Sequence, residues 1–129
     1  MLSTDAFNYV NVLDKAADAS WKRENLLTNN IANVDTPGYK RKDLDFASTL
    51  KEELGKNKYD SLDDKIKQVD LSKLNPSVYR DYSNYSYRLD ESNVDIDNEQ
   101  VELASEQIHY QGIAAAINGE FDRMRSVIK

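Results

Sequence analysis

The chain has 129 residues, of which 31% are charged and 9% aromatic, with a net charge of −6 and no cysteine. The acidic balance argues against nucleic-acid binding, because phosphate contacts need a surplus of basic side chains, and the absence of cysteine excludes disulfides and thiolate metal sites. His109 is the one histidine, and no phosphate-binding loop or nucleophile motif is present, so we expect neither a cofactor, nor a metal site, nor enzymatic activity.

The first predicted element is a long amphipathic helix that ends near Asn33. No proline or glycine occurs between Asp5 and Asn33. Steps of four and three residues from Ala6 pass through an apolar series that resembles a coiled-coil seam, although Ser20 and Glu24 interrupt it. A single helix cannot bury such a stripe alone, so it must pair with another element. The candidate contact residues of this helix are Val10, Leu13, Ala17, Leu27 and Ile31.

A helix stop and a forced turn follow. Asparagine tolerates the backbone conformations found at helix C-termini. Pro37 pushes Thr36 out of the helical region, and Pro37-Gly38 suits the two central positions of a type II turn. The segment therefore fixes the direction in which the chain leaves the helix. Its candidate turn residues are Asn30, Asn33, Thr36, Pro37, Gly38 and Tyr39.

Residues 47–92 carry weaker signals. Between Leu50 and Leu74 a helix-compatible pattern of apolar residues is scattered among charges, and Asn75-Pro76 ends it. Residues 85–89 alternate like a short edge strand. We expect an irregular, partly disordered segment: a loop, a short hairpin or a disordered arm.

The last predicted element, residues 93–129, is a second long helix. Asp97 with Gln100 three residues later suggests an N-terminal capping pair. Steps of four and three residues again give an apolar face, which Ile108 and Ile113 widen. The candidate contact residues of this face are Leu103, Tyr110, Ala114, Ile117, Phe121, Met124 and Ile128.

These elements predict an all-α fold in which two long terminal helices form a coiled-coil-like pair. We divide the chain into residues 1–46 (helix and turn), 47–92 (irregular middle segment) and 93–129 (C-terminal helix), which together form one domain. The two helices can pair within one subunit, between subunits, or both. No run approaches the ~18 apolar residues of a membrane-spanning helix, and the first residues lack the pattern of a signal peptide.

The string from Asn30 to Asn33, followed by Thr36-Pro37-Gly38-Tyr39, closely resembles the N-terminal signature of bacterial flagellar axial proteins. Within that group the chain is most similar to the flagellar basal-body rod protein family, and in particular to its proximal-rod members. Arg23, residues 42–46 and residues 93–97 also match the family pattern.

The resemblance implies a structural subunit of the proximal rod, which polymerises through its terminal helices into the torque-transmitting driveshaft. The implied partners are other rod subunits, rod-base proteins and export-gate proteins. The implied location is the periplasmic rod, reached through the type III export channel of the flagellum without a cleaved signal peptide.

Two alternatives stay open. The first is a soluble α-hairpin that binds a partner helix as an adaptor or export chaperone, although an isolated hairpin has no need of the turn motif. The second is another axial component, such as a distal-rod or hook protein, which the short chain disfavours.

Overall fold

The computed structural model describes residues 7–56, 58–81 and 92–128. In chain order its elements are α1 (Asn8–Ala32), β1 (Lys42–Asp43), α2 (Phe46–Gly55), α3 (Leu62–Gln68), the 3-10 helix η2 (Leu71–Lys73), β2 (Tyr79–Arg80) and α4 (Ile96–Ile128). Helices dominate, so the prediction of an all-α fold is confirmed. Among the described helices, none combines the length and the apolar character that a membrane crossing requires.

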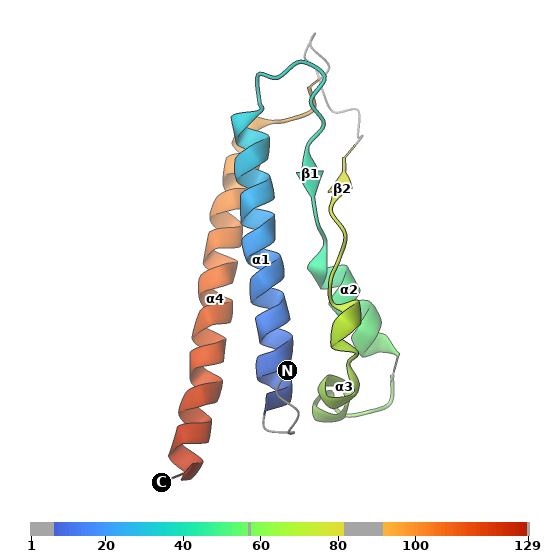
Figure 1. The fold of residues 1–129 in the computed structure, drawn as a ribbon, viewed down its shortest axis with the longest axis vertical. Coiled ribbons are helices and arrows are strands. Elements are labelled where there is room, and N and C mark those ends of the chain that lie inside the picture. Colours follow the sequence, from blue (N-terminus) through green and yellow to red (C-terminus); the bar gives the residue numbers. More distant parts are fainter. Residues whose placement is uncertain (1–6, 57, 82–91, 129) are drawn as a thin grey trace.

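The two long helices, α1 and α4, run antiparallel along the length of the molecule (Figure 1). They share the most extensive contact between any two elements. The predicted pairing of the terminal helices therefore occurs within one chain. The helices have 25 and 33 residues, respectively.

The start of α4 differs from the prediction in one detail. The carboxylate of Asp95 accepts hydrogen bonds from the backbone N–H groups of Asp97 and Asn98, at 3.0 and 3.3 Å. Asp95 is thus the capping residue, and the predicted capping role of Asp97 is wrong. The two acids lie two residues apart, and only the earlier one precedes the first helical residue, where a side-chain oxygen reaches the unpaired N–H groups. Ser3, Thr4 and Asp5, which are residue types that cap the start of a helix, lie outside the described residues.

The chain from β1 to β2 forms a third layer on the side of α1 opposite α4 (Figure 1). Its β1 strand pairs antiparallel with β2, Lys42 opposite Arg80. Lower down, Val12 of α1 lies in a small buried cluster with Ile66 and Leu74. Within its described residues the middle segment is more regular than the sequence indicated: α2 overlaps the start of the weak 50–74 pattern and α3 lies inside it. The strand predicted at residues 85–89 lies outside the described residues.

Local capping explains why short helices form in such a charged segment. The Asp45 carboxylate accepts from the Ser48 N–H at 3.0 Å at the start of α2, and the Ser61 hydroxyl accepts from the Asp64 N–H at 3.3 Å at the start of α3. Each cap satisfies an N–H group that has no partner within its helix, an effect of about 1 kcal/mol. Burial of one apolar side against α1 adds the tertiary stabilisation that short helices need.

Candidate functional site

The predicted contact residues of α1 lie on its inner side. Val10 and Leu27 are buried, Leu27 completely, while Leu13, Ala17 and Ile31 are half-buried. On this helix the spacing of apolar residues therefore picked out side chains that are largely withdrawn from water.

On α4 the predicted contact residues divide. Four of them are half-buried: Leu103, Ala114, Ile117 and Met124. Three are exposed, in increasing order Tyr110, Phe121 and Ile128, the last with 82% of its surface accessible. The buried positions of α4 are Glu99, Glu106 and Ile113, spaced by seven residues. Two of these three are acidic, so a search for apolar periodicity passed over them. Ile108, expected to widen the buried face, is 70% exposed.

The turn residues adopt the predicted geometry. The Tyr39 N–H donates to the Thr36 carbonyl at 3.2 Å, which closes a four-residue turn with Pro37 and Gly38 at its centre. Gly38 has φ of +69°, as the third position of a type II turn requires. The Thr36 hydroxyl donates to the side-chain oxygen of Asn33 at 3.1 Å and ties the turn to the helix end. The type II turn is confirmed.

Asn30 joins the helix end to three other segments. Its side chain is completely buried. Its amide nitrogen donates to the Lys42 carbonyl at 2.9 Å and to Glu99 at 3.1 Å, and its oxygen accepts from the Lys42 N–H at 2.9 Å and the Tyr39 hydroxyl at 3.0 Å. These four bonds use the full hydrogen-bonding capacity of the amide. Asparagine is therefore required at position 30 by the arrangement of these hydrogen-bond partners, and not by its helix propensity.

Asn93 performs a similar function just before α4. Its side-chain oxygen accepts from the Arg41 N–H at 2.9 Å, and its amide nitrogen donates to the Asp81 carbonyl at 2.6 Å. Its backbone N–H donates to the Tyr39 carbonyl at 3.2 Å. The chain entering α4 is thus fixed to the segment that follows the turn.

Two arginines complete this region. Arg23 of α1 binds Asp43 at 2.8 Å, Glu102 at 2.8 Å and Glu106 at 2.9 Å. Arg41 binds Asp43 at 3.0 Å and Asp81 at 3.2 Å, and its Nε donates to Glu99. We call the set Arg23, Asn30, Arg41, Asp43, Glu99 and Glu106 the ionic junction. It connects α1, β1 and α4 through charged hydrogen bonds in a largely buried setting.

The electrostatics of the ionic junction favour its charged form. Burial by itself would raise the pKa of Asp43, but hydrogen bonds from Arg23 and Arg41 outweigh it and hold the pKa below its usual range. For Glu106, burial is likewise outweighed by the neighbouring Ser20 and the Arg23 guanidinium, and the pKa is lowered. Removing one partner would therefore leave a buried charge without its counter-charge.

Sequence reasoning did not assign a role to most of these residues. Arg23 and Asp43 were recognised only as matches to a family pattern, and Arg41 was not singled out. One signal was present: Glu99, Glu102 and Glu106 lie three and four residues apart, so they share one side of a helix. The arginines that bind them lie 58 or more positions away along the chain, and periodicity carries no information about such pairs.

The chain was compared with known proteins. A family model described as flagella basal body rod protein matches residues 15–40, which contain Arg23, Asn30 and the turn. The flagellar basal body rod protein FlgB of Bacillus subtilis is 34% identical over 118 residues, which cover 90% of this chain and 89% of the relative. The FlgB proteins of Escherichia coli and Aquifex aeolicus are each 30% identical, over 84% and 97% of this chain and over 83% and 96% of their own lengths.

The similarity thus extends over most of the chain and most of each relative. The residues of the helix end and turn, which the ionic junction joins to α4, lie within the segment that the family model matches. This chain belongs to the FlgB family of flagellar basal body rod proteins.

Proposed function

We propose that this chain is a structural, non-enzymatic subunit of the proximal rod, and that it polymerises through its terminal helices. Membership of the FlgB family supports the rod assignment. The observation that supports polymerisation is the exposed apolar surface of α4. Its exposed large apolar side chains are Ile96, Val101, Ile108, Tyr110, Phe121, Val127 and Ile128. Such a concentration on one helix is typical of a protein–protein contact.

The C-terminal end of α4 is the first such contact. Phe121 and Ile128 lie seven residues apart, hence on one face, and are 44% and 82% exposed. The half-buried Met124 lies between them in the series. We propose that this face packs against the terminal helices of neighbouring rod subunits, of the same or another kind.

The partners and the location follow from the same assignment. We propose that the subunit is built into the periplasmic rod next to rod-base and export-gate proteins. We further propose that it arrives through the flagellum's own export channel without cleavage of a signal peptide. The absence of cysteine supports this route, since no disulfide has to be broken before the chain unfolds for passage.

A fractionation experiment separates this proposal from a cytoplasmic adaptor or chaperone. A strain that carries a tagged copy in place of the gene should yield the protein in detergent-extracted basal bodies, with motility kept. Deletion should remove flagella. N-terminal sequencing of the protein from basal bodies should begin at the start of the chain. Recovery from the cytosol alone would refute the rod assignment.

A matched pair of variants tests the contact face. Phe121→Asp should leave the helical content unchanged, because Phe121 is exposed, and should abolish flagella. Asp122→Asn, at the adjacent exposed position, should leave motility intact. Motility that survives Phe121→Asp would show that this face is not an assembly contact.

A further inference from the structure

A second exposed face of α4 has a composition unlike the rest of the chain. Val101 and Ile108, seven residues apart and therefore on one side of the helix, are 67% and 70% exposed. Between Val101 and Gly119 the only carboxylates are Glu102 and Glu106, and there is no lysine or arginine. Both glutamates bind Arg23 of α1. The outer side of α4 is thus uncharged over about five turns, in a chain that is 31% charged.

The same side carries one acidic group at its start. Asp97 lies four residues before Val101, so it continues the same face. Asp97 is exposed, as are Ala104 and Ala115 farther along this side. The outer face of α4 is therefore an apolar stripe with a carboxylate at its N-terminal end, which is the pattern of a helix that docks into a groove.

An apolar groove with basic edges lies on the other side of the molecule. It is formed where α2 meets α3 and has a volume of about 420 Å³. Its walls are Ala47, Leu50, Leu54 and Gly55, and the charged residues in the lining are Lys51 and Lys65, with no carboxylate. Within the described part of the chain, neither lysine forms an ion pair.

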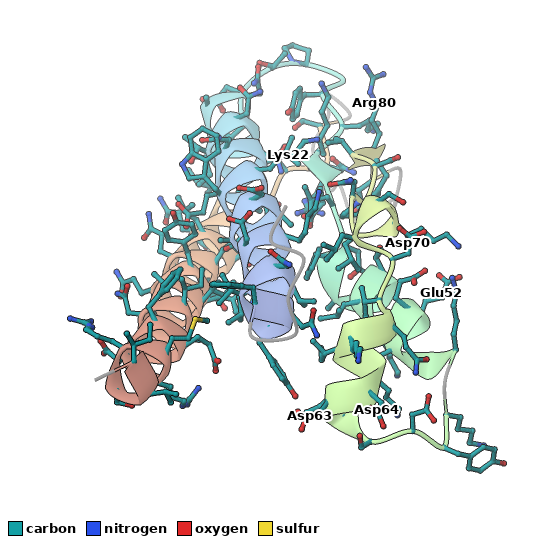
Figure 2. The ribbon with its side chains drawn as sticks, turned by 60° about the horizontal axis from the view of Figure 1, so that its bottom comes forward. Lys22, Glu52, Asp63, Asp64, Asp70 and Arg80 are labelled. Atoms are coloured by element: carbon teal, nitrogen blue, oxygen red, sulfur yellow. The ribbon has the colours of Figure 1, made fainter. Side chains whose placement is uncertain are left out.

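The acidic residues of α2 and α3 lie outside the groove lining. Figure 2 shows Asp63 and Asp64 together on α3, with Glu52 of α2 apart from them. Asp63 accepts a hydrogen bond from the Tyr9 hydroxyl of α1. The groove itself therefore offers an apolar floor and positive charge, the complement of the outer face of α4.

We infer that the outer face of α4 of one copy docks into the α2–α3 groove of a second copy, with Asp97 near Lys51 and Lys65. The two surfaces lie on opposite sides of α1 (Figure 1), so they cannot meet within one chain. A contact between different surfaces of identical subunits is heterologous and can propagate. The inference rests on the proposed polymerisation and adds a specific lateral contact to it.

The charge pattern also disfavours α1 as the occupant. The side of α1 that faces away from both layers carries the exposed charges of Asp14, Asp18 and Lys22 beside Trp21, which is 60% exposed. Burying these charges against the uncharged face of α4 would cost free energy that no partner there offsets. The α2–α3 groove is the better match in both apolarity and charge.

The absence of native cysteine allows a direct test. Two purified full-length variants, Ala47→Cys at the groove and Ile108→Cys on α4, are mixed under oxidising conditions, one of them tagged to distinguish its size. We expect a disulfide-linked heterodimer. The control replaces Ile108→Cys with Asp18→Cys on the charged side of α1 and should give only background linking.

Charge reversal sharpens the test. Adding Lys51→Glu and Lys65→Glu to the groove partner should abolish the heterodimer, and Asp97→Lys on the α4 partner should restore it. Equal yields for Ile108→Cys and Asp18→Cys, exclusive linking of Ile108→Cys to itself, or no response to charge reversal would each overturn the inference.

The same variants distinguish this inference from the proposed function. If cells with Lys51→Glu and Lys65→Glu build rods while Phe121→Asp cells do not, and no heterodimer forms, the groove contact is wrong and rod assembly through the helix ends stands. If tagged protein is missing from basal bodies altogether, the proposed function itself fails.

Discussion

The two halves of α1 are held in place by different kinds of interaction. The C-terminal half lies in the ionic junction, where side chains from α1, β1 and α4 meet through charged hydrogen bonds. The N-terminal half contacts α2 and α3 through a small apolar cluster around Val12, Ile66 and Leu74. Charged networks demand particular atoms at particular distances, whereas apolar clusters demand mainly volume. The ionic junction therefore determines how α1, β1 and α4 are aligned, whereas the apolar cluster mainly covers the N-terminal half of α1.

The largest effect should come from breaking the ionic junction. Arg23→Met removes the cation that Asp43 and Glu106 share and leaves buried carboxylates without their partner. We expect a loss of about 3–5 kcal/mol in the free energy of unfolding, measured by urea denaturation.

Lys22→Met is the matched control, because Lys22 is the exposed neighbour on the same helix. Its unfolding free energy should stay within about 0.5 kcal/mol of the wild type. Equal losses in the two variants would mean that the junction does not stabilise the fold.

The apolar cluster should give a smaller and more local effect. Leu74 is 1% exposed, and Leu74→Ala should cost about 2–3 kcal/mol, at the lower end for core truncations because a small cluster relaxes easily. Amide exchange should accelerate in α2 and α3 and stay slow in α4. Leu62→Ala, at an exposed position, should leave exchange unchanged; uniform acceleration throughout the chain would show that the two regions unfold as one.

The turn that follows α1 should respond to a single methyl group. Gly38 has φ of +69°, so Gly38→Ala should cost about 1–2 kcal/mol of unfolding free energy. Gly55→Ala provides a control of opposite sign, since Gly55 ends α2 with a backbone that suits any residue and no atom lies near its added Cβ. If both substitutions destabilise alike, the strain argument for Gly38 is wrong.

The smallest expected effect is the response to acid, to which the buried carboxylates of the ionic junction contribute. The pKa values of Asp43 and Glu106 are held below 3.8 and 4.5, their ordinary values. A carboxylate with a lowered pKa stabilises the folded state above its ordinary pKa, and that contribution is lost as the pH falls through the folded value.

We therefore expect stability to fall as the pH drops below about 4.5, as followed by urea denaturation at several pH values. In Asp43→Asn this fall should be shallower, because one of the two groups no longer titrates. An unchanged slope would exclude Asp43 as a source of the pH dependence.

The sequence by itself determined the two long helices, the stop after Asn30 and the type II turn. These features depend on apolar spacing, on the fixed φ of Pro37 and on the freedom of Gly38, which are properties of neighbouring residues. The same local rules predicted that some of the apolar residues of α4 would face a partner, but they could not tell which side of the helix α1 would cover.

Tertiary structure alone decided that choice. The buried side of α4 includes Glu99 and Glu106 because Asn30, Arg41 and Arg23 lie opposite them. From sequence alone a glutamate is expected at the surface, and only the fold shows which cation it meets. Likewise, the weak pattern between Leu50 and Leu74 became two helices because Val12 of α1 offered them an apolar surface. Contacts between residues far apart in sequence set both outcomes, so spacing along the chain could not reveal them.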